Sequence, residues 1–223
     1  MTAPVTMDTD LDEAPATEGG RRPARRFGLL AVAVAVVVGL LLGYAGGLLT
    51  PTFTRPGDNS PEAGFARDMS THHAQAVEMG LMAFQQGQDP EVRQIGGDIA
   101  TGQQGEIGTM QTWLRSWHLD PTGDQPPMAW MPDGAGLVTN GLMPGMATPD
   151  EMAKLRAAHG HDFDVLFLQM MIKHHLGGIH MIQGVLDEGH DQDVLAVAQV
   201  MKNTQQTDLT NLQAALKRLG GAA

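Results

Sequence analysis

A continuous apolar segment lies near the N-terminus of the chain. Phe27 to Leu49 is 23 residues long and carries no charged side chain. At about 1.5 Å per residue, a helix of that length spans a hydrocarbon core of about 30 Å. The pattern predicts one transmembrane helix over residues 27–49.

The charges beside this segment predict its orientation. Arg55 is the one basic residue that follows closely, whereas four precede the segment: Arg21, Arg22, Arg25 and Arg26. The positive-inside rule then predicts a single-pass cell-membrane protein with residues 1–26 in the cytoplasm and the C-terminal domain outside. A cleaved signal peptide is the alternative, although its apolar region is typically about 7–15 residues and ends in an A-x-A-like site. Gly43 to Gly47 offers only weak cleavage candidates.

The residues that flank the apolar segment have few apolar side chains that could form a core. Residues 1–20 contain five acidic and almost no large apolar side chains, so we expect residues 1–26 to form a disordered tail. Residues 50–59 contain Pro51 and Pro56 and are expected to be a linker. The folded domain is expected over residues 60–223.

The pattern of the folded domain is helical throughout. Cap residues followed by proline mark three helix starts, at Ser60-Pro61, Asp89-Pro90 and Thr148-Pro149. We expect four helices at about residues 60–86, 89–117, 148–188 and 191–219, the third interrupted near Gly160. No stretch alternates with the period of a strand, so the fold class is all-α. The connection over residues 118–147 is long enough to be a crossover or a functional loop.

The helical part of the chain contains an internal repeat with an offset of 102 residues. In its first half Phe65, Met69, His72, His73 and Met79 map onto Phe167, Met171, His174, His175 and Met181. The match continues in the next helix, where Gln103-Gln104 and Glu106-Ile107 map onto Gln205-Gln206 and Asp208-Leu209. Two like hairpins that each bury an apolar stripe predict a ferritin-like four-helix bundle, with the long connection as its crossover.

The repeated residues place two imidazoles and two thioethers on one face of a helix in each half. At about 100° per residue these side chains fall within roughly a third of the circumference. Imidazole is a borderline donor and thioether a soft one, a combination that suits copper as Cu(I) or Cu(II). The predicted ligands are Met69, His72, His73, Met79, Met171, His174, His175 and Met181. The long connection is expected to add an entry or transfer site, made of Met143, Met146 and the Met128-Trp130-Met131 patch.

A purely structural core is the alternative to a metal site. Methionine at helical spacing is commonly core filling, and a buried imidazole can be satisfied by polar partners. Gln103, Gln104 and Glu106, with Gln205, Gln206 and Asp208, are the candidate partners. His159 and His161 are expected to face solvent, and His180 lies on the face opposite His174.

Composition narrows the possible functions further. The chain has 15 Met, nine His and no Cys, which excludes disulfides and thiolate metal sites. A formal net charge of −11 argues against a nucleic-acid partner. No Glu-x-x-His motif occurs in the bundle, so di-iron oxidase chemistry is not expected, and no catalytic motif stands out. We expect a binding protein rather than an enzyme; the sequence names no protein partner and no oligomeric state.

The doubled Met-x-x-His-His pattern resembles the domain of unknown function 305 (DUF305) family. The segments that carry the likeness are Phe65 to Met79, Phe163 to Met181, Gly145-Met146 and the Gln103 to Leu114 stretch. The resemblance covers about residues 60–219. It implies a ferritin-like four-helix fold in an exported or membrane-tethered bacterial protein, and copper binding as in some members of the family.

Overall fold

The structure is a computed structural model that describes residues 28–132 and 134–221; the expected tail over residues 1–26 lies outside them. The described part of the chain separates into two units, which divide after Phe53. In the first unit, helix α1 (Leu29–Thr54) contains a stretch from Leu29 to Leu48 with a mean hydropathy of 2.5 and no burial. The expected apolar helix is present, and it continues into the first residues of the expected linker.

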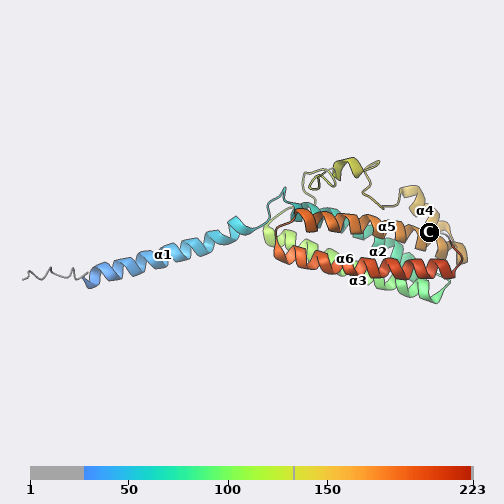
Figure 1. The fold of residues 1–223 in the computed structure, drawn as a ribbon, viewed down its shortest axis with the longest axis horizontal. Helices are drawn as coiled ribbons and strands as arrows, with labels where there is room; N and C mark the ends of the chain where they lie inside the picture. The colour runs from blue at the N-terminus through green and yellow to red at the C-terminus, as the bar shows by residue number, and fades with distance from the viewer. Residues whose placement is uncertain (1–27, 133, 222–223) are drawn as a thin grey trace, which may run out of the picture. The chain divides into compact units, whose positions relative to one another are not determined.

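The second unit is a bundle of four long helices (Figure 1). Its helices are α2 (Pro61–Gln86), α3 (Pro90–Trp117), α5 (Gly160–Glu188) and α6 (Gln192–Arg218), with a short α4 (Pro149–Ala157) and a 3-10 turn, η1 (Gly134–Leu137). Hairpin α2–α3 packs on hairpin α5–α6 through contacts of α2 with α5 and of α3 with α6. The described residues contain no β-strand beyond one isolated bridge, so the all-α prediction is confirmed.

The helices begin where the cap residues predict. The side chains of Ser60, Asp89 and Asp191 each accept a bond from a backbone N–H in the following turn. Thr148 and Glu151 form a reciprocal capping box at the start of α4. The expected interruption of the third segment falls between Ala157 and Gly160, where Gly160 takes a φ of +61°.

Two buried carboxylates join the hairpins reciprocally. Glu62 of α2 accepts the N–H groups of His190 and Asp191 in the α5–α6 turn, at 2.5 and 3.0 Å. Asp164 of α5 accepts those of Gln88 and Asp89 in the α2–α3 turn, at 3.0 and 2.8 Å. Both carboxylates and both turns are related by the same offset of 102 residues. Each hairpin therefore completes the turn of the other.

The apolar core consists of two clusters at opposite ends of the bundle. One includes Met79, Phe163 and Met171, and the other includes Phe65, Met69 and Met181. Each cluster combines one end of α2 with the opposite end of α5, so these helices run antiparallel. The four paired histidines belong to neither cluster and, by their positions in α2 and α5, lie between the two.

Candidate metal centre

The four paired histidines form one layer at the contact of α2 with α5. His72 and His73 come from α2, His174 and His175 from α5, and all are at most 1% exposed. The rings of His72 and His174 stack, with centroids 3.8 Å apart and an angle of 36° between their planes. The two repeats therefore contribute to one shared layer rather than to two remote sites.

Backbone carbonyls determine the tautomers of the stacked pair. His72 Nε2 lies 3.0 Å from the carbonyl of Pro144, and His174 Nε2 lies 3.0 Å from the carbonyl of His72. A carbonyl oxygen only accepts, so each ring donates its Nε2–H. Each therefore keeps its lone pair on Nδ1, the deprotonated nitrogen that a metal ion requires.

The outer imidazoles face carboxylates from the second helix of each hairpin. His73 Nε2 donates to Glu106 at 2.8 Å, which leaves the lone pair on Nδ1. His175 Nδ1 donates to the carbonyl of Met171 at 3.0 Å, which leaves the lone pair on Nε2. Asp208 lies 3.5 Å from that Nε2 without a hydrogen bond, and this contact becomes an ion pair only when the ring is protonated. A carboxylate that accepts the other ring N–H, as Glu106 does from His73, typically orients a metal-binding histidine.

Several lone pairs in the layer are buried without a hydrogen-bond partner among the described residues. They are Nδ1 of His72, Nδ1 of His73 and Nε2 of His175. A buried polar atom without a partner costs about 1–3 kcal/mol, so three in one layer need a compensating interaction. Coordination of a soft or borderline metal ion would supply it, and the residues present fit such an ion.

Thioethers lie on both sides of the histidine layer. Met79 and Met171 are fully buried in one core cluster, and Met69 and Met181 in the other. Each of these two pairs contains one methionine from each hairpin. The sequence pattern had instead grouped the two methionines of the same hairpin. In the described part of the chain, no three His, Asp or Glu side chains gather as a metal-binding group. The buried thioethers are the donors nearest in the fold that could complete a centre with three or more side-chain ligands.

Comparison with known families and structures identifies the fold. The model of the family described as Domain of unknown function (DUF305) matches residues 62–216. The chain belongs to the DUF305 family. The resemblance predicted from the doubled Met-x-x-His-His pattern is confirmed.

Solved structures agree with this assignment. A DUF305 protein from Streptomyces coelicolor, described as secreted, is 38% identical, with a TM-score of 0.68 over 74% of this chain and 97% of its own. A DUF305 fragment from Deinococcus radiodurans is 27% identical, with a TM-score of 0.59 over 71% and 96% of the two chains. CopM in its Cu(II)-bound form is 22% identical, with a TM-score of 0.55 over 71% and 97%. No curated protein matches the sequence.

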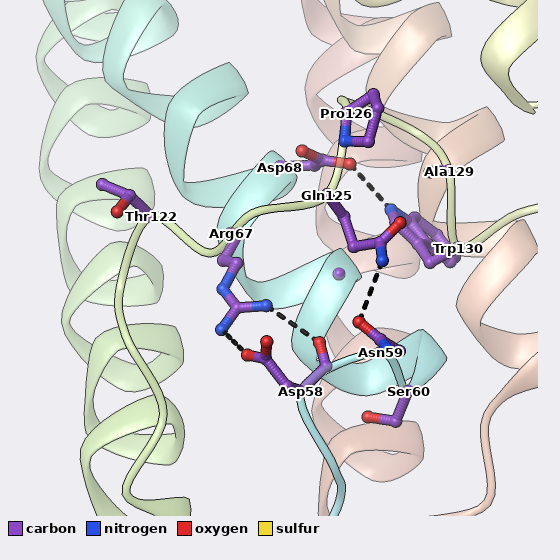
Figure 2. A pocket seen from close by; sticks show the side chains of 11 residues that line it. Asp58, Asn59, Ser60, Arg67, Asp68, Thr122, Gln125, Pro126, Ala129 and Trp130 are labelled. Carbon is purple, nitrogen blue, oxygen red and sulfur yellow. Dashed lines mark hydrogen bonds and ion pairs between the residues drawn. The ribbon is translucent and has the colours of Figure 1, made fainter.

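The long connection of this DUF305 protein is fastened to α2. Asp68 accepts a hydrogen bond from the backbone of Met128 at 2.7 Å and, as Figure 2 shows, one from the indole of Trp130 at 2.8 Å. Burial raises the pKa of Asp68 despite these bonds. The pocket of about 220 Å³ beside them is lined by groups that mostly bond one another, including Arg67 with Asp58, so we assign it no ligand.

The connection also carries the remaining predicted ligands. Met143 is 4% exposed and packs in the cluster of Phe65, whereas Met146 is half-buried. Met146 is thus the most accessible of the ten predicted ligands. His159, His161 and His180 are exposed, as expected.

The sequence did not indicate two of the groups around the histidine layer. The Pro144 carbonyl is a backbone atom of a loop, and nothing in the sequence marks it. Gln75 binds the same loop. One feature of the sequence marks it, because the equivalent position of the second repeat is Gly177 and not a polar residue.

Burial of the stacked pair predicts that this DUF305 protein is sensitive to acid without metal. Burial and the neighbouring His73 lower the pKa of His72 to about 3, and burial and His72 hold that of His174 well below its usual value. Both rings stay neutral in the fold, while the unfolded chain takes up protons below about pH 6.5. The free energy of unfolding should therefore fall by about 4 kcal/mol between pH 7 and 5, about 2 kcal/mol for each ring.

Urea denaturation of the metal-free protein at several pH values measures this slope. The variant His72→Gln/His174→Gln should show a flatter dependence in the same pH range. An equal slope in both proteins would contradict burial as the cause.

Proposed function

We propose that this protein binds copper as its cargo in an extracytoplasmic domain, and that it buffers the ion or hands it on without catalysing a reaction. The observation that carries the proposal is the layer of buried imidazoles with unpaired lone pairs, flanked by four thioethers. Imidazole accepts Cu(II) as well as Cu(I), and thioether favours Cu(I). The proposed ligands come from Met69, His72, His73, Met79, Met171, His174, His175 and Met181.

The similar structures support copper as the cargo. CopM has been solved in Cu(II)-bound, Cu(I)-bound and Ag-bound forms. Its identity of 20–22% to this chain shows a common fold and does not transfer its ligands residue by residue. The ligand assignment here therefore rests on the donors of this chain.

Two variants with equal numbers of histidines test the proposal. The first replaces the buried residues His72, His73, His174 and His175 by glutamine, which retains hydrogen bonding. The second replaces the exposed residues His118, His159, His161 and His180 by glutamine. The untagged full-length chain and both variants are produced with added copper, purified in detergent and analysed for metal content.

We expect copper in the wild type and in the exposed-histidine variant, and almost none in the buried-histidine variant. Circular dichroism confirms that all three proteins remain helical. Because both variants lose the same number of imidazoles, equal copper content in the two would contradict a centre in the buried layer.

The contact of Glu106 with His73 favours a second candidate, a structural or partner-binding helical module of the cell envelope. At 2.8 Å, this carboxylate satisfies one nitrogen of His73 without a metal. In that case, the histidines hold the hairpins together through polar contacts. Near-zero copper in the wild type as well as in the buried-histidine variant would favour this candidate.

We also propose that α1 anchors the domain in the cell membrane, with the bundle on the outer side. The stretch Leu29–Leu48 has the length and hydropathy to span a bilayer. After an alkaline carbonate wash, the full-length chain should remain in the membrane pellet, and a variant lacking residues 1–49 should be released. A mature protein whose N-terminal sequence begins after the apolar stretch would instead identify a cleaved signal.

A further inference from the structure

The segment Met143–Ala147, here called the strap, is held on α2 by the side chains of Gln75 and His72. Gln75 donates from Nε2 to the carbonyl of Ala147 at 2.9 Å, and its Oε1 accepts the N–H of Ala147 at 2.7 Å. The side-chain amide of Gln75 thus makes the same two hydrogen bonds to Ala147 that a paired residue on a neighbouring strand would make. It holds the C-terminal end of the strap on α2, next to the histidine layer.

On α5 the strap lies directly against the helix backbone. A methyl group at Gly177 would overlap the carbonyl of Pro144. A Cβ at Gly145, whose φ is +82°, would lie 2.5 Å from the carbonyl of Lys173. The two glycines therefore permit a backbone-to-backbone approach that leaves no space for a side chain between strap and helix.

The two contacts occupy equivalent positions of the repeat. Gln75 and Gly177 are 102 residues apart, so the same position of the repeat holds glutamine in the first hairpin and glycine in the second. In the first hairpin the side-chain amide of Gln75 binds the strap. In the second hairpin the absence of a side chain at Gly177 lets the strap lie against the helix backbone. The otherwise symmetric bundle is thus asymmetric at the point where the strap crosses it.

The strap also contacts the centre directly. The carbonyl of Pro144 accepts the Nε2–H of His72, so the strap holds this ring in its stacked position. Release of Pro144 would free His72 to turn. Met143, buried, and Met146, half-buried, are carried on the same segment.

We propose that the strap is the gate of the histidine layer, and that Gln75 is the positioning residue that keeps it closed. The inference rests on the proposed function. A metal ion meets Met146 on the outside, and it reaches the imidazoles when the strap separates from Gln75 and from α5. Gln75 and Gly177 then govern how fast the centre loads, and they do not change how much metal it holds.

The test measures loading rate and final capacity separately, with Ag(I) as a probe that undergoes no redox change. The full-length chain in detergent is mixed with Ag(I), and bound metal is followed by time-resolved native mass spectrometry. Gln75→Ala removes two hydrogen bonds, so we expect loading about 10- to 30-fold faster at unchanged final stoichiometry. Amide exchange at Ala147 should accelerate by a similar factor.

Two further variants complete the design. Gly177→Ala pushes the strap off α5 without touching Gln75 and should also speed loading. Gln85→Ala, the same change at an exposed position of the same helix, should leave both rates unchanged.

The outcomes separate the two proposals. Faster exchange at Ala147 with unchanged Ag(I) loading overturns the gate while the metal site stands, and so does unchanged exchange at Ala147 in Gln75→Ala. A wild type that takes up no Ag(I) overturns the proposed function, and with it the role of the strap in access.

Discussion

Replacing both Glu62 and Asp164 by alanine is expected to lower the free energy of unfolding by about 4–6 kcal/mol, because four backbone N–H groups lose their acceptors. That loss is comparable with the entire stability of many domains. Burial acts to raise the pKa of Glu62, but hydrogen bonds from the amides of His190, Glu62 and Asp191 and from the Ser60 side chain together outweigh it and leave that pKa lowered. The carboxylate is therefore charged at neutral pH. Urea denaturation followed by circular dichroism measures the change.

Amide substitutions discriminate between loss of charge and loss of acceptors. Glu62 uses one oxygen, Oε1, for both of its turn amides, so Glu62→Gln should cost less than about 1 kcal/mol. Asp164 uses both oxygens, so Asp164→Asn places an NH₂ group against the N–H of Asp89 and should cost about 2 kcal/mol. The exposed Asp162→Asn serves as the control on α5. Equal losses at Glu62 and Asp164 would show that charge alone matters.

Replacing all four buried helix methionines by leucine is expected to weaken Cu(I) binding by about a hundredfold and to leave Cu(II) binding nearly unchanged, a difference of about 2.7 kcal/mol. The residues are Met69, Met79, Met171 and Met181. Leucine has nearly the same volume as methionine, so the packing of both core clusters should be retained. Competition with a Cu(I) chelator and, separately, with a Cu(II) chelator measures the two affinities.

A control for this variant is available in the cluster that contains Met69 and Met181. Met110 and Met201 are also buried, on α3 and α6, and are not among the predicted ligands. Leucine at both should leave the Cu(I) affinity unchanged. If the control and the four-methionine variant lost Cu(I) affinity equally, the effect would come from repacking of the core.

Local signals in the sequence were sufficient to predict the helices. Ser60, Asp89 and Thr148 are caps whose partners lie within three residues, so their roles follow from short-range geometry. The break before Gly160 was predicted as well, although no side chain caps the helix that begins there. The repeat predicted that both His pairs face the core, and all four imidazoles are buried there.

The arrangement of the site depended on contacts between residues far apart in the chain. The pattern assigned Met69 and Met79 to one hairpin, but antiparallel packing of α2 on α5 places Met79 in one cluster with Met171. The stacking of His72 on His174 likewise depends on how far α2 and α5 are shifted along each other, which the sequence pattern does not give. The Pro144 carbonyl was unpredictable because a backbone acceptor in a loop has no residue type of its own.

The exchange of carboxylates between hairpins also bears on how such a chain could arise. In a single hairpin on its own, the backbone N–H groups of the turn would have no acceptor, and the buried carboxylate would have no donor. Pairing with a second identical copy would satisfy both needs at once, because each copy would lend its carboxylate to the other's turn. A homodimer of half-length chains is therefore a self-sufficient ancestor, and gene fusion through the long connection would preserve its symmetry while allowing Gln75 and Gly177 to diverge.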